Sequence, residues 1–276
     1  MSVNSNSSTN TMKIPYYVVH SFTDRIFGGN PAGVCPVEKW PPDEVLQRIA
    51  FENNLAETAF FRHEASGIKL RWFAPMAEVD LCGHATLAAA FVLSQCLGYE
   101  GPSVSFETRS GRLTVVRDRG RMSMDFPVLT MEPVPVSSDL TAALGIQPIG
   151  AFESMDLVAI FESESQVDSI RPDLERLKQI PGRAVIVSAP GDSSDYVLRC
   201  FGPKVGIPED PATGSAQSML APYWCGRLNK NVLSVRQLSS RGGEMWCTVN
   251  NGRVEIAGNA ALYLSGHIEI PDRATD

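Results

Sequence analysis

The segment from Ala85 to Leu97 constrains the fold more than any other part of the sequence. It reads Ala-Thr-Leu-Ala-Ala-Ala-Phe-Val-Leu-Ser-Gln-Cys-Leu, which is long enough for a helix and apolar on nearly every side. A helix that is hydrophobic all round must be enclosed by other elements. Leu81-Cys82-Gly83-His84 leads directly into this helix, so a thiol and an imidazole stand at its start.

A second apolar helix is predicted after the loop from Gly206 to Gly214. In this loop Glu209 and Asp210 lie between two prolines, which restrict the backbone on either side of the acids. Ser215 is the predicted N-cap, and the unpaired N–H groups at the start of the helix would attract a carboxylate or a phosphate. An ordinary acidic loop ahead of a capped helix is the alternative. Pro222 should kink or shorten this helix.

The elements around these two buried helices follow the same order twice. Each part is predicted to contain a helix, strands, a loop with glycine, the buried helix and further strands, and His84 and Ser215 lie about 130 residues apart. This repeat predicts an α+β fold of two pseudo-symmetric halves, each wrapping strands around its own central helix. We expect a disordered tail at residues 1–11, a first half at 12–130 and a second half at 131–276, whose last strand can pack with the first half.

The composition argues against several classes of partner. The net charge of −7, the pI near 5.2 and the lack of any Lys or Arg run disfavour binding to nucleic acid or to an anionic membrane. No apolar stretch reaches the length of a membrane span, and the first residues lack the features of a secretion signal, so we expect a cytoplasmic protein. The cysteines are widely spaced and are expected to be reduced: Cys35, Cys82, Cys96, Cys200, Cys225 and Cys247.

The sequence predicts no cofactor and no metal site. The glycine-rich stretch from Phe27 to Val34 has neither the spacing of a dinucleotide fingerprint nor the Gly-Lys-Ser/Thr of a phosphate loop. It is either a tight turn between strands or a binding loop. The histidines are too scattered for metal ligation: His20, His63, His84 and His267.

Glu57 is the acid that most suggests a chemical role. In the predicted strand from Leu55 to Arg62 it shares one face with Ala59 and Phe61. A carboxyl group on an apolar face is costly unless it is paired, protonated or reactive. The alternative is that Glu57 points outward. The matching strand of the second half, Ala184 to Ala189, has no acid, so the two halves differ in their chemistry.

The repeat also predicts where the polar groups meet. Pseudo-symmetry would bring the starts of the two buried helices to face each other across the cleft between the halves, where small-ligand sites usually lie. The amides near Gly83, Gly214 and Ser215 would then bind an anion. The side chains expected in the cleft are Glu57, Cys82, His84, Glu209, Asp210, Thr213 and Ser215.

Four ordered motifs resemble the phenazine-biosynthesis F-type (PhzF-like) isomerases. They are Gly29-Asn30-Pro31-Ala32-Gly33-Val34, Asn54-Leu55-Ala56-Glu57-Thr58-Ala59-Phe60, Leu70-Arg71-Trp72-Phe73-Ala74-Pro75 with Glu78-Val79-Asp80-Leu81-Cys82-Gly83-His84-Ala85-Thr86, and Glu209-Asp210-Pro211-Ala212-Thr213-Gly214-Ser215-Ala216. The likeness runs from Ile14 to the last predicted strand. It implies the diaminopimelate-epimerase-like fold, with a barrel-like sheet around each central helix, and usually a homodimer.

The resemblance also implies roles for single residues. Glu57 would be the acid/base that moves a proton on a carbon of the substrate, with His84 and Asp210 opposite it as further catalytic residues. The substrate-binding residues would be Gly83, Gly214, Ser215, Asn30 and Cys82. Related epimerases use one cysteine from each half, but here Pro211-Ala212 stands at the second of these positions.

Together these features predict a cofactor-independent isomerase or epimerase that acts on a small carboxylate. A proton next to a carboxylate is weakly acidic, so a base must be near and fixed donors must meet the developing negative charge. Two alternatives stay open, namely a non-catalytic protein that binds a small acid in the same cleft and a cysteine-based racemase that uses Cys82. His84 can also be a structural residue that caps its helix.

Overall fold

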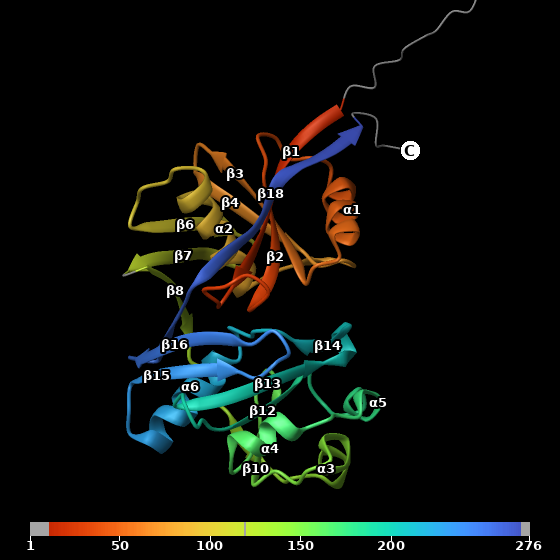
Figure 1. Ribbon diagram of the computed structural model, residues 1–276, viewed down its shortest axis with the longest axis vertical. Helices are drawn as coiled ribbons and strands as arrows, with labels where there is room; N and C mark the ends of the chain where they lie inside the picture. The colour runs from red at the N-terminus through yellow and green to blue at the C-terminus, as the bar shows by residue number, and fades with distance from the viewer. Residues whose placement is uncertain (1–10, 119, 272–276) are drawn as a thin grey trace, which may run out of the picture.

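The computed structural model describes residues 11–118 and 120–271 and shows two bodies of strands, one above the other in Figure 1. Of the expected disordered tail, residues 1–10 lie outside the described part, and Thr11 is already the first residue of strand β1. None of the helices in the described ranges is both long enough and apolar enough to cross a membrane.

The upper body in Figure 1 holds most of the N-terminal elements. Its helices are α1 (Asp43–Asn53) and α2 (Gly83–Phe91), and α2 continues into a π-helical turn, η1 (Val92–Cys96). The strands are β1 (Thr11–Ser21), β2 (Asn30–Pro36), β3 (Glu57–Glu64), β4 (Gly67–Phe73), β5 (Glu78–Val79), β6 (Ser103–Thr108), β7 (Gly111–Asp118) and β8 (Arg121–Pro127).

The lower body holds most of the C-terminal elements. Its helices are α3 (Ser138–Leu144), α4 (Glu164–Ser169), α5 (Leu174–Leu177), the 3-10 turn η2 (Pro203–Val205) and α6 (Gln217–Leu228). The strands of the second half are β9 (Glu132–Val134), β10 (Gly150–Glu153), β11 (Leu157–Ile160), β12 (Val185–Pro190), β13 (Tyr196–Gly202), β14 (Ile207–Asp210), β15 (Val232–Gln237), β16 (Gly243–Asn250) and β17 (Arg253–Gly258). The last strand, β18 (Ala260–Pro271), returns to the upper body, where it lies beside β1.

The strand pairing repeats from one half to the other. Strand β3 lies between β2, to which it is parallel, and the antiparallel β4, and β12 lies in the same way between β11 and β13. Strands β4 and β13 each pair in parallel with the first strand after the central helix, β6 and β15. Two bodies with equivalent pairing confirm the predicted α+β fold of two pseudo-symmetric halves.

Within residues 11–118 and 120–271, the two halves share one hydrogen-bonded network of 18 strands. Strands β8 and β17 pair antiparallel and join the halves. After each of these two strands the chain passes into the other half. Strand β9, which follows β8, pairs with β10, and β18, which follows β17, pairs with β1 along its length. A division of the chain near residue 130 stays a prediction, as does the homodimer.

Both central helices are enclosed, although for less of their length than the sequence suggests. In α2 every residue from Ala85 to Ala90 is buried, but the α-helix ends at Phe91, and Leu97 is exposed. In α6 burial covers Gln217 to Ala221 and Trp224, whereas the last turn lies at the surface. The helical run from Gly83 to Cys96 nearly matches the predicted Ala85 to Leu97, but full burial ends at Leu93, because apolar composition does not reveal where the surrounding strands end.

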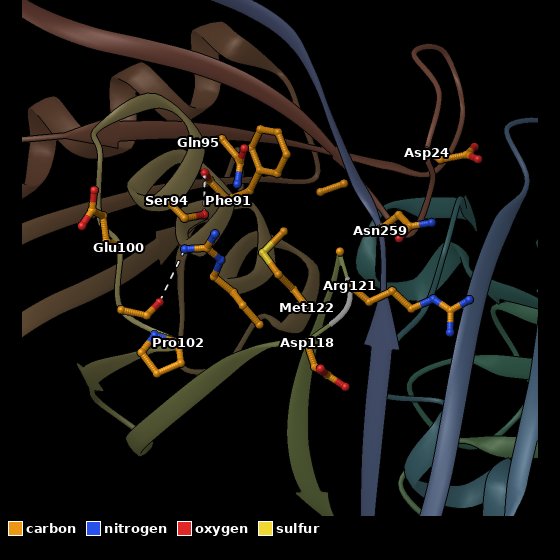
Figure 2. Close-up of a pocket in the computed structure, with 14 residues that line it drawn as sticks. Asp24, Phe91, Ser94, Gln95, Glu100, Pro102, Asp118, Arg121, Met122 and Asn259 are labelled. Atoms are coloured by element: carbon orange, nitrogen blue, oxygen red, sulfur yellow. Dashed lines mark hydrogen bonds between the residues drawn. The ribbon is translucent and has the colours of Figure 1, made fainter.

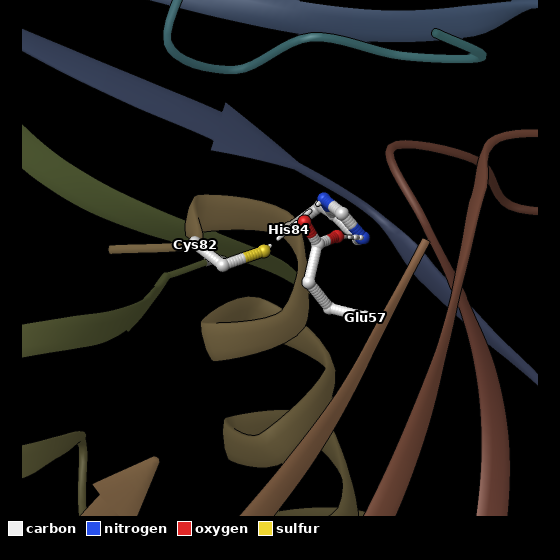
Figure 3. A group of neighbouring side chains, drawn as sticks. All are labelled: Glu57, Cys82 and His84. Atoms are coloured by element: carbon white, nitrogen blue, oxygen red, sulfur yellow. Dashed lines mark hydrogen bonds and ion pairs between the residues drawn. The ribbon is translucent and has the colours of Figure 1, made fainter. Parts of the chain in front are cut away.

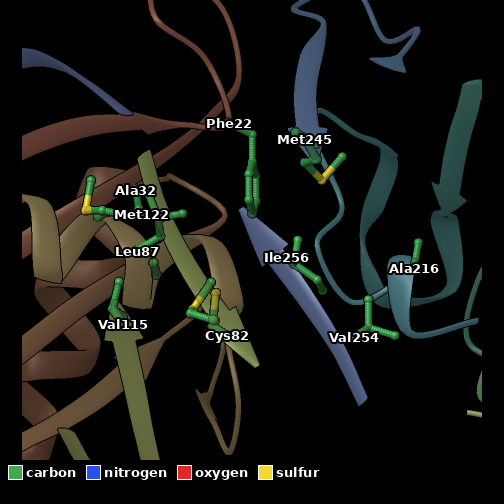
Figure 4. Close-up of a cluster of buried hydrophobic side chains, with 14 of the residues drawn as sticks. Phe22, Ala32, Cys82, Leu87, Val115, Met122, Ala216, Met245, Val254 and Ile256 are labelled. Carbon is green, nitrogen blue, oxygen red and sulfur yellow. The ribbon is translucent and has the colours of Figure 1, made fainter. Parts of the chain in front are cut away.

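One hydrophobic core runs through both halves. It includes residues around α2, such as Leu87, and residues of the second half, such as Ile256 on β17. Phe22 stands between these two groups in Figure 4, and its side chain is fully buried. A Cβ atom on Gly258 would lie 2.5 Å from the Phe22 ring, so glycine is required there for the halves to pack.

The second central helix differs from expectation at two residues. Of the two effects expected of Pro222, a kink or a shorter helix, the second does not occur, since α6 continues to Leu228. The carbonyl of Ser218, which loses its partner in the helix, accepts a hydrogen bond of 2.9 Å from the N–H of Leu129. Ser215 is not the N-cap. The helix begins after Ala216, without a side-chain cap, and Ser215 is exposed.

We expect Leu87→Ala to lower the free energy of unfolding by about 2–5 kcal/mol, because it leaves a cavity inside the first barrel. Leu87 is fully buried on α2, whereas Phe51 on α1 is 61% exposed and offers a control. Urea unfolding of Leu87→Ala and Phe51→Ala measures both effects. Equal losses in the two variants would contradict the central position of α2.

Candidate active site

Three side chains of the first half meet at the start of α2 (Figure 3). Glu57 is the first residue of β3, Cys82 precedes the helix, and His84 lies in its first turn. Oε2 of Glu57 is 3.2 Å from Nε2 of His84, and Sγ of Cys82 is 3.5 Å from Nδ1 of the same ring. Ser21 fixes this end of the helix by donating to the carbonyl of His84 over 2.7 Å.

Glu57 and His84 are close but are not hydrogen-bonded to each other. Oε2 of Glu57 and Nε2 of His84 are both buried and lack a hydrogen-bond partner among the described residues. Their side chains are only 15% and 11% exposed, so little water can reach them. Buried polar atoms without partners are costly and mark places where a ligand can complete the hydrogen bonding.

Burial sets the protonation of this pair. It raises the pKa of Glu57 to about 7, with the negative charge of Asp210 adding to the rise and a hydrogen bond from Cys82 opposing it. Burial alone lowers the pKa of His84 to about 4. At neutral pH the imidazole is therefore uncharged, and the carboxyl group beside it exists in both forms.

Asp210, the last residue of β14, is held from both halves. Asn30 Nδ2, on β2, donates to Oδ1 of Asp210 over 2.8 Å, and the Thr213 hydroxyl donates to Oδ2 over 2.6 Å. Burial raises the pKa of Asp210 to about 6, opposed by Thr213, Asn30 and the charge of Arg183. Because its charge also raises the pKa of Glu57, the two carboxyl groups are coupled across the halves.

The other predicted site residues take different places. Gly83 starts α2, and Gly214 lies against the Phe22 ring, where an added Cβ would be 3.2 Å away. Glu209 forms a bidentate ion pair with Arg199, at 2.7 and 3.0 Å, so its charge is already neutralised. The structure thus brings Glu57, Cys82 and His84 together and couples them to Asp210, while Glu209 has a structural role.

Gln237 is a site residue that the sequence reading missed. This buried side chain on β15 accepts from the N–H of Thr213 over 2.7 Å and donates to the backbone carbonyl of Asp210 over 2.6 Å. A signal was present, since alternation along the strand places Gln237 on the same face as the buried Leu233 and Val235. The same alternation places Glu57 on the face of β3 that carries Ala59 and Phe61.

The cluster at α2 could also offer ligands to a metal ion, since one atom each of Glu57, Cys82 and His84 lie within 4.8 Å of one another. However, the thiol lies at Nδ1 of the imidazole and the carboxylate at Nε2, and a metal ion binds one ring nitrogen. Burial, reinforced by the charge of Glu57, also raises the pKa of the Cys82 thiol, which disfavours the thiolate form. The geometry fits proton transfer better than metal ligation.

A cavity of about 640 Å³ lies away from this cluster, beside the C-terminal end of α2 (Figure 2). Arg121 stands at its edge with the guanidinium 3.5 Å from the centre of the Trp246 ring, and Arg117 donates to the carbonyl of Tyr99. Neither Glu57 nor Asp210 lines it. The buried atoms without partners converge at the start of α2, so this cluster, and not the cavity, is the candidate active site.

Comparisons with known proteins give a consistent result. A family profile for phenazine biosynthesis-like proteins (PhzC-PhzF) matches residues 19–266. An uncharacterized isomerase of Pseudomonas aeruginosa is 46% identical over 259 residues, which cover 94% of this chain and 100% of the relative. A crystal structure from the PhzF family of Enterococcus faecalis is 45% identical, with a TM-score of 0.91 over 93% of this chain and 99% of that chain.

The fold is also shared with a more distant protein. A hydroxyproline epimerase from Agrobacterium vitis is 10% identical, with a TM-score of 0.62 over 95% of this chain and 94% of that chain. At this identity the likeness concerns the fold alone. It agrees with the diaminopimelate-epimerase-like architecture that the sequence motifs imply.

We expect Glu57→Gln to gain stability relative to the wild type as the pH rises from 5 to 8. Because the pKa of Glu57 is raised from 4.5 to about 7, its carboxyl group stabilises the fold at low pH and loses this contribution as the pH rises through about 7. The glutamine has no such dependence, so the difference should grow by on the order of 2 kcal/mol.

Urea unfolding at the two pH values measures this change. Glu52→Gln, at an exposed position on α1, is the matched control and should not alter the pH dependence. A stability difference between Glu57→Gln and the wild type that stays constant with pH would show that Glu57 ionises like an exposed acid.

Proposed function

Because this chain belongs to the phenazine biosynthesis-like (PhzC-PhzF) family of isomerases, we propose that it moves a proton on a carbon of a small carboxylate substrate, without a cofactor. The observation that carries this proposal is the carboxyl group of Glu57. It is buried, its Oε2 lacks a hydrogen-bond partner among the described residues, and its pKa lies at about 7. A group that must take a proton and return it works best when its pKa lies near the working pH.

His84 is the proposed partner of Glu57. Burial raises the pKa of Cys82, so the thiol stays protonated. Its single proton can be donated either to Glu57 or to Nδ1 of the imidazole 3.5 Å away, and we assign it to Nδ1 during the reaction. The neutral ring then carries its own proton on Nε2, the atom that faces Glu57. An N–H group at this position can donate to the negative charge that develops when Glu57 removes a proton from the substrate.

The starts of the central helices supply the remaining donors. Neither α2, which begins at Gly83, nor α6, which begins just after Ser215 and Ala216, has a side-chain cap. The first N–H groups of a helix, together with its dipole, favour a bound carboxylate. We therefore assign the carboxylate of the substrate to the amides near Gly83, Gly214 and Ser215.

Asp210 is the proposed acidic group of the second half. With a pKa of about 6, it is mostly ionised at neutral pH, where its charge keeps part of Glu57 protonated. If a substrate brings a proton or a positive charge between the two carboxyl groups, this repulsion falls. One proton can thereby reside on either of the two carboxyl groups, Glu57 or Asp210, during a transfer.

The two alternatives from the sequence are less well supported. A cysteine-based racemase needs a thiolate, but burial raises the pKa of Cys82 and also that of Cys200, the thiol beside Thr213. A protein that only binds a small acid needs the helix N-termini but gains nothing from a buried carboxyl group next to an unpartnered imidazole nitrogen. The geometry favours Glu57 as the base.

We expect Glu57→Gln to reduce proton exchange roughly 10²–10⁴-fold while leaving ligand affinity nearly unchanged, because the amide keeps the shape of the side chain but cannot act as a base. Deuterium uptake from heavy water, followed by NMR over a panel of small chiral or unsaturated carboxylic acids, identifies an exchanging compound and measures the rate. Cys82→Ser should keep most of the exchange. If Cys82→Ser abolished exchange while Glu57→Gln did not, the thiol would be the base.

A further inference from the structure

Asn30 is the residue of the first half that touches the acidic group of the second. Its side chain is fully buried, and Nδ2 donates to Oδ1 of Asp210 over 2.8 Å and to the carbonyl of Ala212 over 3.0 Å. An amide nitrogen has two hydrogens, so both of its donors are used. These contacts join positions 180 and 182 residues apart.

We propose that Asn30 is a positioning residue that aims the carboxylate of Asp210 at the active site and ties this orientation to the docking of the two halves. This inference rests on the proposed function, in which Asp210 faces Glu57. It differs from the role expected from the sequence, where Asn30 was assigned to the substrate. With both donors occupied, the atom of Asn30 that remains for a ligand is Oδ1, which is buried and has no hydrogen-bond partner in the described part of the chain.

The turn that carries Asn30 is itself fixed by the second half. Arg241 donates to the carbonyls of Gly28 and Gly29 over 2.9 and 2.8 Å, and the N–H of Gly29 donates to the carbonyl of Gly242 over 3.0 Å. Gly29 has φ 59°, and a Cβ atom there would lie 2.1 Å from the carbonyl oxygen of Ser21. The turn therefore has one conformation, and it delivers Asn30 to Asp210 in one orientation.

The loop that carries Asp210 is also fixed by hydrogen bonds. Thr213 holds Oδ2 of Asp210, and Gln237 holds both the N–H of Thr213 and the backbone carbonyl of Asp210. Asn30 is the contact in this group that comes from the other half of the molecule. Separation of the halves would break the hydrogen bond from Asn30 and would leave Oδ1 of Asp210 without this donor.

The ionisation of Asp210 reports on this contact, because a hydrogen bond to the charged form of an acid lowers its pKa. The charged and titratable groups that face Asp210 are Arg183, Glu209, Glu57, Cys82 and Cys200. None of them is altered when Asn30 is replaced. A change in the titration of Asp210 on such a replacement therefore comes from the lost donor or from a shift of the halves.

Two variants separate these causes. Asn30→Leu keeps the number and branching of the side-chain heavy atoms but removes the donor, whereas Arg241→Met removes the neighbouring contacts to Gly28 and Gly29 and leaves Asp210 with all of its partners. Protein labelled with ¹³C at the aspartate carboxyl groups is titrated by NMR, and Asp210→Asn identifies the resonance. The experiment uses the full chain and needs no substrate.

We expect the midpoint of the Asp210 titration to rise by about one pH unit in Asn30→Leu. In Arg241→Met, where the turn keeps the hydrogen bond from Gly29 to Gly242 and Asp210 keeps its own partners, the rise should be clearly smaller than in Asn30→Leu. An unchanged midpoint in Asn30→Leu would overturn the inference, and so would equal shifts in the two variants, since the effect would then come from docking alone.

A second measurement on the wild type does not depend on the folding of a variant. The two Nδ2 protons of Asn30 should exchange slowly with solvent, and their resonances should move with the same midpoint as Asp210. Side-chain protons that exchange quickly, or that ignore the titration of Asp210, would contradict the contact. Failure to find an exchanging carboxylic acid would count against the proposed function, while these titrations would still decide the role of Asn30.

Discussion

The enclosure of α2 by strands is the constraint on which the rest of the structure depends. A helix that is apolar on nearly every side must be enclosed by other elements, here by strands, so its ends are the places where polar groups can gather. The active-site cluster lies at the N-terminal end of this helix, where Cys82 and His84 meet Glu57. The strands that enclose α2 also remove Glu57 and His84 from water, and this desolvation shifts the pKa of both side chains.

The second half repeats the architecture but not the chemistry. The strand after its central helix α6 pairs in parallel with β13, as the strand after α2 pairs with β4, yet the residue placed beside the start of α6 is Asp210, with Thr213 and Asn30 as partners. Two buried carboxyl groups that repel each other across a joint are unfavourable for folding, because each raises the cost of ionising the other. A site of this kind lowers the stability of the fold, but it provides a group that can gain and lose a proton near neutral pH.

The joint between the halves makes the asymmetric site possible. Phe22 packs against Gly214 and Gly258, Arg241 holds the turn before Asn30, and β8 pairs with β17. These contacts fix one arrangement of two bodies that would otherwise be separate barrels. Residues more than 150 positions apart, such as Glu57 and Asp210, can influence each other only because this arrangement is rigid.

The sequence alone determined the parts that depend on local pattern. The largely apolar run from Ala85 to Leu97 required an enclosed helix, the order of elements indicated two halves, and the position of Glu57 on an apolar strand face made it a candidate for a chemical role. Tertiary structure decided the rest, because partners distant in the chain leave no local signal. Only the folded chain shows Leu129 completing the helix at Pro222, Arg199 neutralising Glu209, and the amide of Asn30 turned toward Asp210.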